Sequence, residues 1–207
     1  MAVTDRAQCA GAEGLVAAVE AAVSGGANAV QLREKDLADG DLLALARRLR
    51  QVTQGRSLLI VNGPLDVALA AGADGVHLPE GAPMHLRPRK GFLVGRSVHS
   101  AEAARRVVAE GADYLIAGPV YETRSHAGFQ PAGLALIEEI AAAVGVPVLA
   151  IGGVTAERVG EVVRAGAAGV SVISAIFAPP DPRMAARRLR RALDASWVGS
   201  LTLKRRS

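Results

Sequence analysis

The chain has 207 residues, of which half are hydrophobic and 21% are charged, and this balance predicts one globular domain with a sizeable core. The single cysteine, Cys9, excludes an internal disulfide, and no Cys and His tetrad has zinc-site spacing. No apolar run reaches the roughly 20 residues of a membrane span, and the N-terminal segment lacks the pattern of a signal peptide. We therefore expect a soluble, cytoplasmic protein with no membrane partner.

The net charge of +4 and the isoelectric point near 9.8 raise the question of nucleic-acid binding. Much of the excess charge lies near the C-terminus, at Arg183, Arg187, Arg188, Arg190, Arg191, Lys204, Arg205 and Arg206. Only 3% of the residues are aromatic, so this charge has no stacking surface beside it. We expect a solvated helix face, a frayed basic tail over residues 196–207, and no nucleic-acid partner.

Short apolar runs alternate with helical patterns along the whole chain. Strands are expected within AVT (2–4), GGANAVQLR (25–33), LLIV (58–61), AGADGVHLP (71–79), FLVGRS (92–97), EGADYLIAGP (110–119), VPVLAIGG (146–153) and AGAAGVSVIS (165–174). Helices are expected near 13–24, 40–53, 65–71, 101–110, 133–143, 156–165 and 183–195, with a short one between 82 and 89. Strands that alternate with helices in this way predict a parallel sheet.

The second, fourth, sixth and eighth strand segments resemble one another. Each has a Gly-Ala pair after a helical stretch, then two linking residues and an apolar strand. Because glycine readily adopts the left-handed conformation just past a helix end, these pairs predict turns from helix to strand. Eight such units in a chain of this length predict a single compact (β/α)8 TIM barrel over residues 1–195. An open doubly wound sheet is the alternative, but the fourfold recurrence favours a closed, internally symmetric barrel.

Polar residues are concentrated at the expected carboxyl ends of the strands, where TIM barrels carry their active sites. Gly152 and Gly153 allow a phosphate to approach the backbone, and Ser174 begins a helix whose dipole favours an anion. Ser171 faces either this site or the packing outside it. These residues predict a phosphate ester held without a cationic side chain. The alternative is that the two glycines only turn the chain after the seventh strand.

The second strand runs into a charged segment, VQLREK (30–35). Strand alternation places Gln31, Arg33 and Lys35 on one side, where they would grip an anion at the barrel mouth. Arg33 can bind a carboxylate bidentately, whereas Lys35 supplies a point charge. The alternative is a surface network of these cations with Glu34 and Asp36.

Other strand ends and one long loop supply further candidates. Asn62 and Gly118 end the third and sixth strands. His77 fits a hydrogen-bonded structural residue, and His99 is better placed to contact a ligand. His126 lies in the loop YETRSHAGFQPAG (121–133), where Gly and Pro indicate a mobile cover over the mouth. A neutral imidazole exchanges protons near pH 7, so His126 is a candidate acid or base.

The segments VTDR (3–6), VQLREK, GADGVHLP, GRSVH (95–99), GADYLIAGP, AIGGV (150–154) and GVSVIS (169–174) together resemble the thiamin phosphate synthase superfamily over nearly the whole chain. The resemblance implies a (β/α)8 barrel, a homodimer and one of two activities. The synthase branch joins a pyrimidine diphosphate to a thiazole phosphate using magnesium. The TenI-like thiazole tautomerase branch rearranges a dihydrothiazole carboxylate phosphate alone, without metal or cofactor.

The two branches differ at the positions that hold the synthase metal. The synthase pattern has one Asp after the strand-three Asn and another near the end of strand four. This chain instead reads NGPLDVA (62–68) and HLPEG (77–81), which resemble the tautomerase branch, and YETRSHAG (121–128) replaces the synthase's Thr-Pro-Thr-Lys loop. The resemblance therefore implies a metal-independent isomerase, a thiazole tautomerase of thiamin biosynthesis that binds a thiazole phosphate.

One departure concerns the proton transfer itself. The tautomerase pattern places a catalytic His directly after the strand-six Gly, whereas Pro119 follows Gly118 here. We therefore assign the acid/base role to His126, with Glu122 and His99 behind it. The expected substrate-binding residues are Gln31, Arg33, Lys35, Asn62, Gly118, Gly152, Gly153, Ser171 and Ser174. The alternatives are a divergent magnesium-dependent synthase and a non-catalytic regulatory protein that binds thiazole phosphate.

Overall fold

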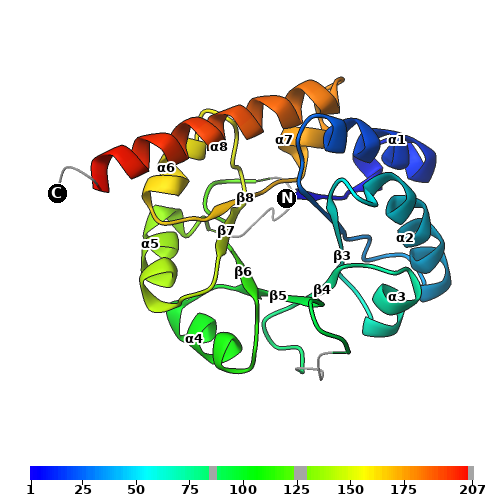
Figure 1. The fold of residues 1–207 in the computed structure, drawn as a ribbon, viewed down its shortest axis with the longest axis horizontal. Helices are drawn as coiled ribbons and strands as arrows, with labels where there is room; N and C mark the ends of the chain where they lie inside the picture. The colour runs from blue at the N-terminus through cyan, green and yellow to red at the C-terminus, as the bar shows by residue number, and fades with distance from the viewer. Residues whose placement is uncertain (84–87, 124–129, 205–207) are drawn as a thin grey trace.

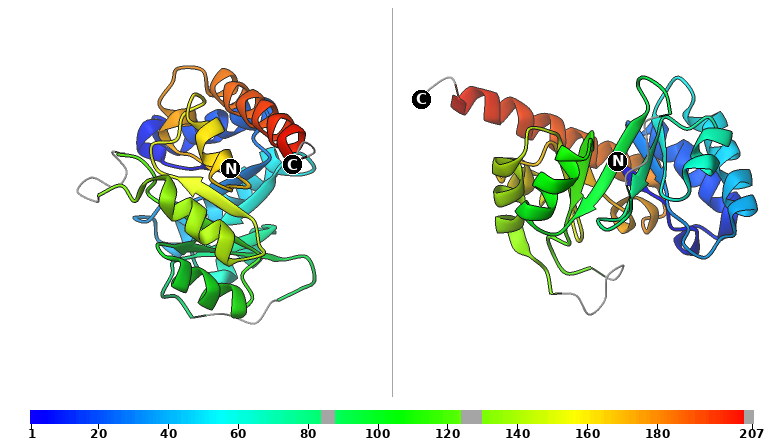
Figure 2. Two further views of the ribbon diagram at one scale, coloured as in Figure 1. Left: turned by 90° about the vertical axis from the view of Figure 1, so that its left-hand side faces the viewer. Right: turned by 90° about the horizontal axis from the view of Figure 1, so that it is seen from below.

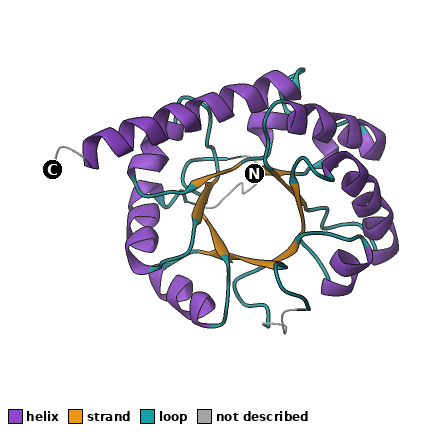
Figure 3. Ribbon diagram, in the orientation of Figure 1, coloured by secondary structure: helices purple, strands orange, loops and turns teal. Residues whose placement is uncertain are grey.

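The computed structural model describes residues 1–83, 88–123 and 130–204. Eight parallel strands form a ring with helices outside it (Figures 1 and 3). The strands are β1 (Ala2–Val3), β2 (Ala29–Leu32), β3 (Leu58–Val61), β4 (Gly75–Leu78), β5 (Leu93–Val98), β6 (Tyr114–Ala117), β7 (Val148–Ile151) and β8 (Gly169–Ser171). The helices are η1 (Arg6–Gln8), α1 (Gly11–Ser24), α2 (Asp39–Thr53), α3 (Leu65–Ala70), α4 (Ala101–Ala109), α5 (Gly133–Ala143), α6 (Val159–Arg164), α7 (Ser174–Phe177) and α8 (Pro182–Lys204).

The ring is continued from β8 back to β1 by backbone hydrogen bonds. Every strand from β1 to β7 pairs in parallel with its successor. The Val3 amide then donates to the Val172 carbonyl at 2.9 Å, and the Val172 amide donates to the Met1 carbonyl at 3.1 Å. The result is a nearly closed (β/α)8 barrel in one compact domain, so the predicted fold class is confirmed.

The repeated segments form the predicted turns from helix to strand. Their glycines have φ between 66° and 108°, in the left-handed region: Gly26, Gly72, Gly111 and Gly166. In two repeats an aspartate lies two residues after this glycine, and its carboxylate accepts a hydrogen bond from a backbone amide at the start of the preceding strand. Asp74 Oδ2 accepts from the Leu59 amide at 2.7 Å, and Asp113 Oδ2 accepts from the Val94 amide at 2.7 Å. The repeated motif thus ends a helix and also joins neighbouring strands.

The main core lies between the ring of strands and the helices. Helix α2 shows how the pattern works, because its buried positions Leu42, Leu45, Ala46 and Leu49 recur at helical spacing on one face. Each leucine buried in this way contributes about 1.5–3 kcal/mol. The long helix α8 packs against α1 and α6 and extends past the barrel (Figure 2). In the described ranges, no helix is long and apolar enough to cross a membrane.

Three element boundaries differ from the sequence prediction. Helix α8 ends at Lys204 rather than near residue 195, because no proline interrupts that stretch and its one glycine, Gly199, weakens a helix without stopping it. β8 ends at Ser171 because α7 begins at Ser174. The short helix expected between 82 and 89 falls partly on residues 84–87, outside the described ranges, and residues 82–83 and 88–89 are not helical.

Candidate active site

Two cavities adjoin at the carboxyl ends of the strands and share Ile151 and Ile173 in their walls. The first has a volume of about 250 Å³ and lies where β7 and β8 end. The second, of about 80 Å³, lies at the centre of the barrel mouth. We call them the glycine pocket and the central pocket. The glycine pocket is lined by Thr123, Ile151, Gly152, Gly153, Val154, Thr155, Ser171, Val172, Ile173, Ser174 and Ala175. The central pocket is lined by Gln31, Arg33, Asn62, His77, Ser97, His99, Ile116, Gly118, Pro119, Ile151 and Ile173.

Both glycines after β7 are needed for the backbone path of the glycine pocket. Gly152 has φ 95° and Gly153 has φ 63°, so both lie in the left-handed region. A β-carbon on Gly152 would lie 2.6 Å from Pro119 Cβ, and one on Gly153 would lie 2.5 Å from the Glu122 carbonyl oxygen. The glycines therefore turn the chain and also leave backbone exposed to a ligand, so the two interpretations of the sequence are compatible.

The glycine pocket offers neutral hydrogen-bond donors to an anion. Ser171 is fully buried, and its Oγ has no hydrogen-bond partner within the described residues. Ser174 begins α7, whose N-cap residue Ile173 makes no side-chain cap, and the first N–H groups of a helix lack partners within that helix. No charged side chain lines the pocket. Unsatisfied buried donors are unfavourable, so this arrangement is suited to a bound phosphate.

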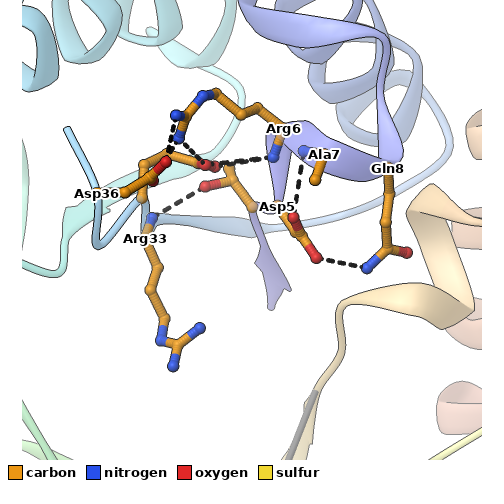
Figure 4. Close-up of polar contacts among 8 residues, drawn as sticks. Asp5, Arg6, Ala7, Gln8, Arg33 and Asp36 are labelled. Atoms are coloured by element: carbon orange, nitrogen blue, oxygen red, sulfur yellow. Dashed lines mark hydrogen bonds and ion pairs between the residues drawn. The ribbon is translucent and has the colours of Figure 1, made fainter. Parts of the chain in front are cut away.

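Arg33 supplies a cation to the central pocket. Its backbone amide donates to Thr4 Oγ1 at 2.9 Å, while its guanidinium points away from the neighbouring acidic residues (Figure 4). Those acids are paired with Arg6 instead, at 3.0 Å to Glu34 and 2.5 Å to Asp36. The described residues show no hydrogen bond or ion pair to the Arg33 guanidinium, and burial lowers its pKa. Glu34 and Asp36 thus form a charged network, but its cation is Arg6 rather than Arg33, which leaves Arg33 available to a ligand.

A buried polar chain runs beneath the central pocket. His77 is 2% exposed, with Nε2 2.9 Å from Ser97 Oγ and Nδ1 3.3 Å from the Tyr114 hydroxyl. Burial, together with the positive charges of Arg33 and Arg96, lowers the pKa of His77 to about 3. His77 is therefore neutral at physiological pH and donates through only one of its two ring nitrogens.

An ion-paired cluster lies at the rim of the central pocket. His99 Nδ1 lies 3.0 Å from Glu80 Oε2, and Arg106 Nη2 lies 3.4 Å from the other carboxylate oxygen. Burial favours the neutral form of Glu80, but the hydrogen bond from His99 and the charge of Arg106 outweigh it and lower the pKa. The His99 side chain is 64% exposed. Glu80 is thus an ionised carboxylate already engaged by two basic groups.

The structure brings most of the expected site residues together, as their places in the two linings show. Lys35 and Glu122 are exposed and line neither pocket. Lys35 lies outside the central pocket because β2 ends at Leu32, and the alternation of side chains along a strand does not extend to residue 35. His126 lies outside the described residues. The expected set omits Thr155, which lies two residues after Gly153 and also lines the glycine pocket.

A larger cavity, of about 490 Å³, lies at the opposite end of the barrel. Its wall is mostly apolar and combines the N-terminal ends of strands with one face of α8, including Leu189, Leu193 and Trp197. We place the candidate site at the other end because TIM-barrel active sites lie at the carboxyl ends of the strands, where the polar groups of this chain converge.

Comparison with known proteins identifies the family. The family model described as thiamine monophosphate synthase matches residues 1–176. A thiamine-phosphate synthase from Methanoculleus marisnigri is 48% identical over 84% of this chain and 86% of its own length. A thiamine-phosphate synthase from Anaeromyxobacter dehalogenans is 44% identical over 87% of this chain and 83% of its own length. The structure of a thiamine phosphate pyrophosphorylase from Pyrococcus furiosus superposes with a TM-score of 0.81 at 34% identity, covering 94% of this chain and 95% of that one.

These relatives correct the expected activity. The sequence led us to expect an isomerase, a thiazole tautomerase, but relatives at 44–48% identity are named synthases, which are transferases, so that expectation is wrong. It rested on the absence of two aspartates, on the replaced Thr-Pro-Thr-Lys loop and on segments that resemble the tautomerase branch. Magnesium often takes only one or two protein carboxylates and completes its shell with phosphate and water, so such an absence is a weak guide to activity. The overall match shows that this chain belongs to the thiamine monophosphate synthase family.

Proposed function

We propose that this chain is a thiamine-phosphate synthase, a transferase that joins a pyrimidine diphosphate to a thiazole phosphate. The observation that carries the proposal is the pair of adjoining pockets. One offers neutral donors suited to a phosphate monoester, and the other offers the unpaired Arg33 guanidinium. The two anionic substrates of a synthase would occupy two such sites side by side, and relatives at 44–48% identity are named thiamine-phosphate synthases.

The proposed reaction exchanges one bond for another. The thiazole ring nitrogen forms a bond to the methylene carbon of the pyrimidine, and the bond from that carbon to the diphosphate oxygen breaks. The electron pair leaves with the diphosphate, and the ring becomes a thiazolium cation. Arg33 would stabilise the developing charge on the diphosphate by bidentate hydrogen bonding. The phosphate grip of the glycine pocket would hold the thiazole ring against the central pocket, which favours the reaction by proximity.

The synthase branch uses magnesium, so the residues near the mouth are relevant to a metal site. Among the described residues, no group of three His, Cys, Asp or Glu side chains could hold a metal ion. Glu80 lies near the position of one family aspartate, but His99 and Arg106 already occupy its oxygens. These residues do not fit a protein-bound magnesium ion. The roles proposed above for Arg33 and the glycine pocket involve no metal.

Formation of thiamine phosphate tests the proposal directly. The protein is incubated with the pyrimidine diphosphate and the thiazole phosphate, in parallel with magnesium chloride and with EDTA, and the product is quantified by fluorescence after oxidation to a thiochrome. We expect catalysed product formation and a loss of about 10²–10³ in kcat for Arg33→Gln. Arg48→Gln is the matched control, because Arg48 pairs with Glu13 on the outer surface.

Two results would contradict the proposal. Product formation no faster than in the protein-free control, in both buffers, would exclude the synthase reaction. Binding of thiazole phosphate without turnover would instead favour the regulatory protein considered above. The homodimer and the cytoplasmic location expected from the sequence stay predictions, and sedimentation and cell fractionation test them.

A further inference from the structure

We propose that His77 is a positioning residue that acts through Ser97. With Tyr114 behind it, His77 orients the Ser97 hydroxyl so that its hydrogen points into the central pocket and is donated to bound substrate. This inference rests on the proposed function for the identity of the substrate, while the hydrogen-bond chain is a property of the protein alone.

The backbone leaves room for the hydrogen bonds that link Tyr114, His77 and Ser97. Tyr114, at the start of β6, projects into the barrel beside β5, and its ring occupies the space where a β-carbon of Gly95 would stand. Gly95 and Ser97 lie two residues apart on the same face of β5. The missing side chain at Gly95 therefore lets the Tyr114 hydroxyl reach His77 Nδ1, while Ser97 meets the opposite ring nitrogen.

The direction of the hydrogen bonds follows from counting protons. The Tyr114 side chain is buried, and the hydrogen bond shown at its hydroxyl is the one to His77 Nδ1 at 3.3 Å. A buried phenol proton that has no acceptor is unfavourable, so this hydroxyl acts as the donor. The phenol proton is then left for His77 Nδ1. A neutral imidazole that accepts at Nδ1 must carry its proton on Nε2 and donate it to Ser97 Oγ.

The Ser97 proton is therefore directed away from His77. Ser97 is half-buried in the wall of the central pocket, beside Arg33 and Asn62. Because its oxygen already accepts from His77, its remaining strong interaction is to donate to an acceptor atom of a ligand. Burial and the charges of Arg33 and Arg96 disfavour a protonated His77. Protonation would make Nδ1 a donor and reverse only the hydrogen bond between His77 and Tyr114, since Nε2 would still donate to Ser97. The buried histidine, which the sequence indicated as structural, thus controls a side chain of the site.

Nuclear magnetic resonance tests the chain without any enzymatic activity. The ring nitrogen shifts of ¹⁵N-labelled protein report the tautomer of His77 and its protonation state. We expect the neutral Nε2–H tautomer from pH 5 to pH 9 in the wild type. We expect a mixture of tautomers in Tyr114→Phe, which removes only the phenol hydroxyl. A dominant Nδ1–H tautomer in the wild type, or spectra unaffected by Tyr114→Phe, would overturn the assignment.

A double-mutant cycle tests the role in the reaction. We expect Tyr114→Phe to lower kcat/KM for thiamine phosphate formation about tenfold, with a urea midpoint near that of the wild type. In the Ser97→Ala background the same change should have no further effect, because the group it positions is gone. Tyr121→Phe is the control, since that hydroxyl bonds Glu161 at 2.7 Å rather than a site residue.

The two proposals fail in different ways. Additive losses of kcat/KM from Tyr114→Phe and Ser97→Ala would show that the hydrogen bonds through His77 are merely structural. That result would overturn the inference even if the wild type is an active synthase. Absence of synthase turnover in the wild type would overturn the proposed function, and the nuclear magnetic resonance result would still decide whether His77 orients Ser97.

Discussion

Replacement of Gly153 by alanine should weaken both the fold and the phosphate grip. Gly153 has φ 63°, and a β-carbon there would lie 2.5 Å from the Glu122 carbonyl oxygen and 2.7 Å from Tyr121 Cβ. The left-handed conformation costs an L-residue about 1–2 kcal/mol. Relief of the overlap requires a backbone shift, and overpacking of this kind costs about 1–3 kcal/mol more. We expect a total loss of about 2–5 kcal/mol in the free energy of unfolding.

Gly72 provides a matched control for the conformational part of this loss. It has φ 66°, nearly the same as Gly153, but no atom lies within 4 Å of the position that its β-carbon would take. Gly72→Ala should therefore cost only about 1 kcal/mol, since the reduced freedom of the unfolded chain offsets part of the strain. The difference between the two variants isolates the overlap beside the glycine pocket.

Urea denaturation measures both stabilities, and isothermal titration calorimetry with thiazole phosphate measures binding. We expect Gly153→Ala to weaken binding at least tenfold and Gly72→Ala to leave the dissociation constant unchanged. The reasoning is refuted if the two variants are equally stable and bind the ligand equally well. It is also refuted if Gly72→Ala weakens binding, because the effect would then come from general destabilisation.

Two further predictions concern buried polar groups. Ser171→Ala should leave the free energy of unfolding within about 1 kcal/mol of the wild type, because the hydroxyl has no partner among the described residues. The variant should weaken thiazole phosphate binding about five- to tenfold, and unchanged calorimetric affinity would contradict the phosphate role. Burial lowers the pKa of His77 to about 3, whereas the pKa in the unfolded chain is near 6.5. The unfolded state therefore binds the proton first, and the free energy of unfolding falls as the pH drops below about 6.5. Urea titrations should show a loss of about 3 kcal/mol by pH 4.5 in the wild type, and His77→Gln should lack this loss. Parallel stability-against-pH profiles for the two proteins would refute the prediction.

The sequence alone was sufficient for the barrel and for most of its mouth. Repeated Gly-Ala turns and alternating apolar runs are local signals, and each names a helix end or a strand without reference to the rest of the molecule. The carboxyl ends of parallel strands meet at one face, so the residues at those ends converge whatever the details of packing. Arg33, Gly153 and Ser171 were found in this way.

Local periodicity failed where an element ended earlier or later than its pattern. Lys35 was assigned to the site because strand alternation was extended beyond Leu32, where the hydrogen-bonded strand stops. Glu122 was named from its neighbourhood in the chain, but its side chain is exposed outside both pockets. The activity was misjudged for a related reason, because absent carboxylates, a replaced loop and short segments were weighed against a match that spans most of the chain.

What the sequence determined by itself was the order of strands and turns, since these follow from short-range propensity and spacing. Only the tertiary structure decided which polar groups have partners. Arg6 is distant from Glu34 and Asp36 in the sequence but pairs with both, so these acids do not neutralise Arg33. Gly95 makes room for Tyr114 to reach His77. Such pairings depend on distances between residues of different strands, which no local pattern in the chain specifies.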